Sequence, residues 1–128
     1  FYCTANGKAI FSYYSPEKLA SILRKIKLSP YTENTISDIA VLERELVMVK
    51  ENGYAVDNEE LEEGLCCYAA PIFDCSGVPA AAISLSGPVF RMKGQAKENM
   101  IHEIKSCAAE ISGILAKSSY MASNQSME

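Results

Sequence analysis

The stretch that decides the fold is residues 65–85, which read LCCYAAPIF-DCSG-VPAAAISL. The two outer segments are apolar and have the length of a strand, and Asp74–Gly77 is a tight-turn sequence. The sequence therefore predicts an antiparallel hairpin with strands over 65–73 and 78–85, ended by Gly87-Pro88.

Side chains alternate between the two faces of such a hairpin. With Asp74–Gly77 as the turn, Cys67 is expected opposite Ser84, and Leu65 opposite Ser86. The opposite face then carries larger apolar residues typical of a core: Tyr68, Ile72, Ile83 and Leu85. The first face collects small and slightly polar residues: Cys67, Ala69, Ala80, Ala82, Ser84 and Ser86.

This small-residue face has two interpretations. Small side chains leave volume unfilled, and the hydroxyls and thiol supply donors, which suits a pocket for a small polar molecule. Alternatively, a helix packs closely against the small residues and the serines bond to the main chain. A β-bulge would also shift the register and disperse the cluster.

A helix start lies upstream of the hairpin. Thr4 is a candidate N-cap for a helix over residues 5–14. The first N–H groups of a helix have no internal partners and, with the helix dipole, favour an anion such as a carboxylate. Gly7 would permit close approach, but the glycine and the Ser/Thr that a phosphate-binding P-loop needs around Lys8 are absent.

The rest of the chain predicts an α+β domain in which helices pack on an antiparallel sheet. Apolar spacing and capping residues predict the other elements: helices over 16–26, from Ser37-Asp38 to Asn52-Gly53 and over 95–117, and a short strand over 54–57. Residues 118–128 are interpreted as a polar C-terminal tail.

Composition limits the function. The chain has 128 residues, of which 48% are hydrophobic and 22% charged, so it can bury a single-domain core. A net charge of -4 argues against DNA contact by this chain itself, because phosphate contacts need a basic surface. The basic cluster Arg24, Lys25 and Lys27 is interpreted as the solvated face of a helix.

Metal binding and catalysis have little support. The adjacent Cys66 and Cys67 should point to opposite faces of a strand, and His102, the only histidine, is expected to be solvated on a helix. No nucleophile elbow is present. The acidic run Glu59, Glu60, Glu62 and Glu63 is interpreted as solvated loop charge. We therefore predict no catalytic residue, no metal and no cofactor.

The five cysteines include no CxxC pair, and no apolar run approaches the roughly 18 residues that a membrane span needs. The reducing cytoplasm is the simplest compartment for unpaired thiols. We expect a cytoplasmic protein with no membrane partner.

Four motifs together resemble the effector-binding domain of bacterial transcription regulators of the isocitrate lyase regulator (IclR) family. They cover nearly the whole chain in family-like order: residues 3–9 (CTANGKA), 53–60 and 64–74 (GYAVDNEE and GLCCYAAPIFD), 81–88 (AAISLSGP) and 108–111 (AAEI).

The resemblance implies a GAF-like domain that binds a small metabolite, often an organic acid, and controls a winged helix-turn-helix DNA-binding domain that this chain lacks. It implies an effector-binding domain over 1–117 whose early helix and strands, before Cys3, are missing, and a homodimer or homotetramer. By motif, Asp57, Cys67, Ser84 and Ser86 match side chains that contact small oxoacids, and Ala5 and Asn6 match main-chain contacts.

Two other functions stay open at this point. A small thiol enzyme could use Cys67 as nucleophile with Asp57 as its base. An oligomerisation module could pack the small-residue face against a partner and hold no ligand. The sequence favours ligand sensing, because three of the four matched side chains share one face of the predicted hairpin.

Overall fold

The computed structural model describes the backbone of residues 1–126 and the side chains of residues 1–118. Helices and strands fall in separate runs, as expected of an α+β domain. In chain order they are α1 (Ala5–Phe11), α2 (Pro16–Lys25), α3 (Ile39–Asn52), β1 (Ala55–Asn58), β2 (Leu65–Phe73), β3 (Pro79–Pro88), the 3₁₀ helix η1 (Val89–Arg91) and α4 (Gln95–Ser126).

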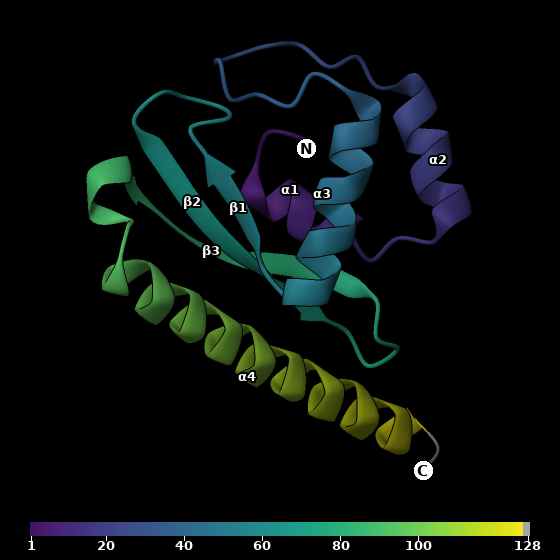
Figure 1. Cartoon of the computed structure of the whole chain (residues 1–128). Helices are drawn as coiled ribbons and strands as arrows, with labels where there is room; N and C mark the ends of the chain where they lie inside the picture. The colour runs from purple at the N-terminus through teal and green to yellow at the C-terminus, as the bar shows by residue number, and fades with distance from the viewer. Residues whose placement is uncertain (127–128) are drawn as a thin grey trace.

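The described strands form one antiparallel sheet in the order β1-β2-β3, with β2 in the middle. Figure 1 shows α4 running along one side of the sheet and α1 on the other, with α3 and α2 stacked beyond α1. The sheet is therefore a layer between helices, and β2 is buried on both faces.

The face of the sheet under α4 holds the main apolar core. Tyr68 and Ile72 of β2 pack against Ile101 and Ile104 of α4, and Met92 closes one end. The Tyr68 hydroxyl donates a hydrogen bond to the Met92 carbonyl, so its polar atom is satisfied. This face confirms the predicted core positions of Tyr68, Ile72 and Ile83, but not that of Leu85.

The face under α1 is built from small residues. Ala5 and Ala9 of α1 lie against Ala55 of β1 and against Cys67 and Ala69 of β2. Because these side chains are short, the α1 backbone approaches the sheet closely. A third cluster, which includes Leu23, Leu42 and Leu46, holds α2 and α3 to the first residues of the chain.

The helix starts agree with the sequence signals. The side chains of Thr4, Ser15 and Asp38 accept hydrogen bonds from the first turns of α1, α2 and α3. Gly53 ends α3 with a φ of 79°, the left-handed conformation in which glycine has no Cβ penalty. Capping residues therefore gave correct starts for these helices.

Two helix ends differ from the sequence prediction. α1 ends at Phe11, not Tyr14, because Pro16 forces Ser15 into an extended conformation and the chain must turn before it. α4 continues through Ser126, into the residues predicted as a tail, because no glycine or proline follows Lys117 to end it. Residues 127–128 of that tail lie outside the described residues.

The predicted hairpin register was wrong by two residues. Cys67 pairs with Ser86, and Ala69 pairs with Ser84. Compared with the prediction, the turn contains one more residue, because the Asp74 N–H donates to the Val78 carbonyl around a wider loop. A second extra residue lies in β3 at the irregularity beside Ile72 and Phe73. Each irregularity alone would exchange the two faces, but together they restore the predicted alternation.

β3 also extends beyond its predicted end, because Pro88 still pairs with Leu65. A proline is tolerated there because β3 is the edge of the described sheet and its outward side has no strand to bond. Edge position also explains why Leu85, expected in the core, is 41% exposed.

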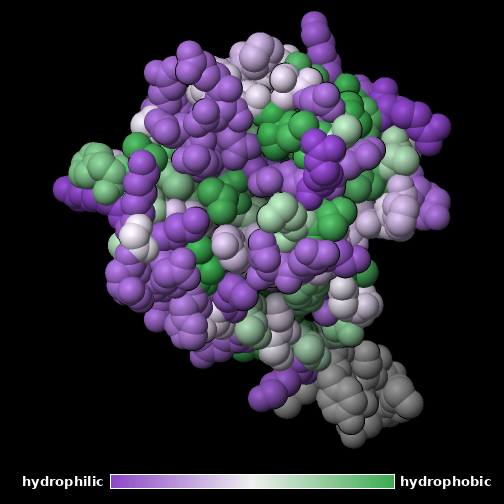
Figure 2. All heavy atoms as spheres, in the orientation of Figure 1, coloured by the Kyte–Doolittle hydropathy of each residue, from purple (hydrophilic) through white to green (hydrophobic). Residues whose placement is uncertain are grey.

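The surface is mixed in character. Figure 2 shows hydrophilic residues over most of the visible face, with hydrophobic ones interspersed. Val47 and Met48 on α3 are among the exposed large hydrophobic side chains. No helix within the described residues combines the length and apolar character needed to cross a membrane.

Candidate functional site

Strand pairing places three of the predicted site residues in one row across the sheet. Asp57 of β1 pairs with Cys67 of β2, which pairs with Ser86 of β3. The next row on the same face is Ala55, Ala69 and Ser84. The structure thus brings Asp57, Cys67, Ser84 and Ser86 to one face, the face that α1 covers.

The four side chains differ in accessibility. Asp57 is 3% exposed and Cys67 is 8% exposed, whereas Ser84 is half-buried and Ser86 is exposed. Within the described part of the chain, neither serine hydroxyl makes a hydrogen bond to the protein. Their donors are therefore free, while Asp57 and Cys67 form the buried end of the row.

The start of α1 lies beside this face. Thr4 Oγ1 accepts from the Gly7 N–H at 3.1 Å, which fixes the helix start. The N–H groups of Ala5 and Asn6 have no acceptor among the described residues; Ala5 is buried and Asn6 is exposed. The space at Gly7 that was predicted to admit an anion is occupied by Phe1, since a Cβ there would lie 2.5 Å from the Phe1 carbonyl oxygen.

A buried ion pair that was not predicted from the sequence lies under the same helix. Lys8 is fully buried, and its Nζ lies 2.9 Å and 3.0 Å from the two carboxylate oxygens of Glu60. Nζ also donates to the Val56 carbonyl at 2.6 Å and to Glu45 Oε1 at 3.3 Å. Lys8 thereby ties α1 to β1, to α3 and to the turn after β1.

Glu60 corrects the interpretation of the acidic run as solvated charge. It is 7% exposed, whereas Glu62 and Glu63 are exposed as expected. Its carboxylate accepts from the Asn58 N–H at 3.0 Å, and its own N–H donates to Asp57 Oδ1 at 2.8 Å. The turn from Asp57 to Glu60 is therefore held by the ion pair and by its own hydrogen bonds.

A signal for Lys8 was present in the sequence. Ala5, Lys8, Ala9 and Ser12 follow helical spacing and are the buried residues of α1 and its C-cap. A lysine within a stripe of small buried residues requires a carboxylate partner, because an unpaired buried charge is very costly. Asp57 on β1 and Glu60 in the turn after it were acidic candidates for this partner.

Burial governs the titration of this cluster. Desolvation raises the pKa of Asp57, more than the hydrogen bonds from backbone N–H groups and the charge of Lys8 lower it. Desolvation also raises the pKa of Glu60, against the opposing attraction of Lys8. The Cys3 thiol lies close enough that, after desolvation, the charge of Asp57 contributes to its raised pKa.

The arrangement combines both interpretations of the small-residue face. The alanine row is filled by α1, as a close helix contact would be, and the polar row ends in free serine donors. The donors without a partner on this side of the described protein are the hydroxyls of Ser84 and Ser86 and the N–H groups of Ala5 and Asn6. Cys67 and His102 do not form a nucleophile–base pair, because Cys67 is buried under α1 and His102 is exposed on α4.

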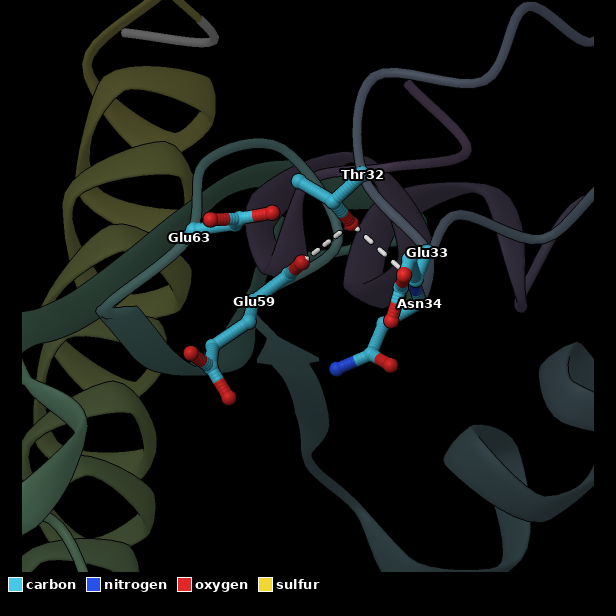
Figure 3. A pocket seen from close by; sticks show the side chains of 5 residues that line it. All are labelled: Thr32, Glu33, Asn34, Glu59 and Glu63. Carbon is cyan, nitrogen blue, oxygen red and sulfur yellow. Dashed lines mark hydrogen bonds between the residues drawn. The ribbon is translucent and has the colours of Figure 1, made fainter.

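A separate concavity of about 340 Å³ lies in the loop region (Figure 3). It is lined by Thr32, Glu33, Asn34, Glu59 and Glu63. The Thr32 hydroxyl points into the loop and donates to the Glu59 carbonyl. Glutamates dominate this concavity, so it would repel an organic anion.

Metal ligands do not gather in the described residues. Cys66 faces the α4 core and Cys67 faces α1, as predicted for adjacent residues of a strand. All five cysteines are unpaired.

Comparison with known proteins gives a consistent picture. The family model described as "Bacterial transcriptional regulator IclR C-terminal" matches residues 1–113. The HTH-type transcriptional regulator BhcR of Paracoccus denitrificans is 42% identical over 106 residues, which is 83% of this chain and 38% of that protein. The chain thus spans less than half the length of this relative.

Solved structures agree. The crystal structure of the Thermotoga maritima IclR matches with a TM-score of 0.86 and 41% identity, over 90% of this chain and 47% of that one. The inducer-binding domain of the Acinetobacter PobR transcription factor, solved as a double mutant with 3-hydroxybenzoic acid, has a TM-score of 0.80. It is 24% identical over 87% of this chain and 64% of that one, and so shares the fold.

Proposed function

The chain belongs to the family of the bacterial transcriptional regulator IclR C-terminal domain, and we propose that it senses a small organic acid on the face of the sheet under α1. The observation that carries this proposal is the row Asp57, Cys67 and Ser86, with Ser84 in the next row. The family is regulatory and not enzymatic, so binding, without turnover, is the activity of the domain.

The donors on this face support an acid as the ligand. The hydroxyls of Ser84 and Ser86 are free, and the N–H groups of Ala5 and Asn6 lack acceptors in the described protein. Together they could bind the oxygens of a carboxylate, as hydrogen bonds to a charged acceptor are among the strongest in proteins. Cys67 and Asp57 would line the buried side.

One solved structure of the same fold holds an organic acid. The PobR domain described above was solved with 3-hydroxybenzoic acid, an organic acid. At its level of identity the likeness concerns the fold, so neither that ligand nor its contacts transfer to these residues.

In the whole regulator, this domain would control an attached winged helix-turn-helix domain in the cytoplasm. Ligand binding would favour one arrangement of a homodimer or homotetramer, and so change the DNA affinity. DNA would be contacted only through that other domain, consistent with the acidic net charge of this chain.

The test is thermal unfolding of the chain with a panel of small carboxylates that includes glyoxylate and pyruvate. A ligand at one hundred times its Kd should stabilise the domain by about 2.7 kcal/mol. The double variant Ser84→Ala with Ser86→Ala should keep the unliganded stability and lose most of this gain.

The matched control replaces exposed serines of α4, Ser106→Ala with Ser118→Ala, and should respond like the parent. If no acid of the panel stabilises the parent at millimolar concentration, the proposal of acid sensing fails. If the Ser84/Ser86 variant responds like the parent, an acid binds elsewhere.

A further inference from the structure

Several carboxyl groups and one ammonium group meet where α1 crosses the end of β1. Lys8 supplies the positive charge, and Glu60, Asp57 and Glu45 supply the carboxyls. Lys8 and Asp57 are almost inaccessible to solvent. The Glu45 side chain is 35% exposed, so water partly screens its charge. One buried ammonium can compensate only one buried carboxylate in full.

Glu60 is the carboxylate that Lys8 compensates. Both of its oxygens lie within 3.0 Å of Nζ, and the Asn58 N–H adds a further hydrogen bond. The remaining donors of Nζ go to the Val56 carbonyl and Glu45. The N–H groups of the Lys8 ammonium are therefore all used, and none of them donates to Asp57.

Asp57 therefore differs from Glu60 in its partners. Within the described part of the chain, its carboxyl group faces the backbone N–H groups of Glu60, which donates to Oδ1, and of Leu61, and no side chain donates to it. An ionised Asp57 would be a buried charge without a cation in contact, which costs far more than the neutral acid.

The other groups around Asp57 give no compensation. Cys3 lies before α1, and Cys66 and Cys67 stand on β2; thiols are neutral or negative. The row continues to Ser86 of β3, which carries no charge. An anionic ligand on this row would add a second negative charge to the same face.

Resting on the proposed function, we propose that Asp57 takes part in ligand binding as a neutral carboxylic acid that donates a hydrogen bond to the anion. The proton on the carboxyl oxygen turns a repelling group into a donor, like the Ser86 hydroxyl along the row. Binding of a carboxylate then takes up about one proton wherever the free domain has Asp57 ionised.

This role selects ligands and couples the site to pH. A ligand with an acceptor next to its carboxylate, as in an oxoacid, can use both the serine hydroxyls and the acid O–H. Above the pKa of Asp57 in the free domain, the Kd should rise about tenfold for each unit of pH, because each bound anion must bring a proton.

Titration calorimetry with pyruvate tests this directly. Pyruvate stays a monoanion between about pH 5.5 and pH 8.5, so any pH dependence belongs to the protein. Measurement in two buffers of different ionisation enthalpy gives the number of protons taken up. We expect uptake that approaches one proton per pyruvate at the upper end of this range, and a Kd that rises with pH.

The variant Asp57→Asn sharpens the test. Its amide oxygen can still accept from the Glu60 N–H, and its amide N–H can donate where the acid O–H did, at any pH. We expect a folded domain that binds pyruvate with no proton uptake and no pH slope, and more tightly than the parent at the upper end of the range. Glu62→Gln, exposed in the same loop, is the matched control and should keep the parent slope.

The outcomes separate the two proposals. If the parent binds pyruvate without proton uptake, the acid role of Asp57 is wrong and acid sensing stands. If a folded Asp57→Asn binds no pyruvate at any pH, the role is equally wrong, because a neutral donor should suffice. If neither pyruvate nor glyoxylate binds the parent anywhere in the range, both proposals fall.

Discussion

The two faces of the sheet are built on different principles. The face under α4 packs large apolar side chains such as Tyr68, Ile72 and Ile104, with few polar atoms to satisfy. The face under α1 packs alanines, and buries a lysine and two carboxyl groups at its edge. The same strand, β2, supplies both faces by alternation of its side chains.

Under the proposed function, this difference separates the part of the sheet that stabilises the domain from the part that binds the ligand. Apolar area on the α4 side stabilises the domain without a preference for any ligand. On the α1 side, short side chains and fixed charges hold a helix start, a buried acid and free serine hydroxyls close together. We therefore expect substitutions on the two faces to have different consequences.

The largest expected effect is that of Lys8→Met. Removal of the ammonium leaves Glu60 buried without a partner, and breaking a buried ion pair in this way costs about 3–5 kcal/mol. Chemical denaturation measures the loss. The double variant Lys8→Met with Glu60→Leu should recover most of it, whereas Lys25→Met on the exposed side of α2 should stay within about 0.5 kcal/mol of the parent.

A truncation on the other face tests its purely structural role. Ile104 is 2% exposed, so Ile104→Ala should lower the free energy of unfolding by about 3 kcal/mol through lost transfer energy and a cavity. The Kd for an acid measured on the folded fraction should not change. A clear change in that Kd would contradict the separation of the faces, and Ile114→Ala, at an exposed position of α4, serves as control.

Two N-caps allow a finer comparison. Thr4→Ala and Asp38→Ala each remove a side-chain cap and should each cost about 1 kcal/mol. Only Thr4→Ala disturbs the N–H groups at the start of α1, so only it should also weaken stabilisation by an acid. Equal ligand responses in the two variants would remove α1 from the site.

The smallest expected effect is the pH dependence of stability without ligand. The folded pKa of Asp57 is raised by burial above its ordinary value of 3.8, so the folded state binds its proton more tightly than the unfolded state. The stabilising contribution is complete below that value and is lost as pH rises through the folded pKa. The stability of Asp57→Asn relative to the parent should therefore increase with pH in this window, as denaturation at several pH values can show.

Local sequence signals predicted much of the fold. Caps at Thr4, Ser15 and Asp38 and the glycine at Gly53 gave correct helix boundaries because each acts through its immediate neighbours. β2 was predicted to the residue, since Gly64 and Asp74 bound an apolar run. The end of α4 was missed because nothing in the sequence stops a helix after Lys117.

Non-local pairings were harder. The register was two residues out because a wider turn and an irregularity beside Phe73 cannot be read from the hydrophobic pattern. The shared face of Cys67, Ser84 and Ser86 was nevertheless correct, because an even shift preserves alternation. The partnership of Lys8 with Glu60 spans 52 positions, and only the buried stripe of α1 hinted at it.

The hairpin contains two irregularities of one residue each. Whether its length changes by an odd or an even number of residues therefore decides which face the β3 side chains lie on. Deleting one residue at the irregularity, for instance Ala80, would turn the rest of β3 over, so that Ile83 and Leu85 faced α1 and the serines faced α4. Deleting one residue at the turn and one at the irregularity together would leave every side chain on its present side. Insertion or deletion of two residues in this hairpin should thus be tolerated. Insertion or deletion of one residue should disrupt the response to ligand.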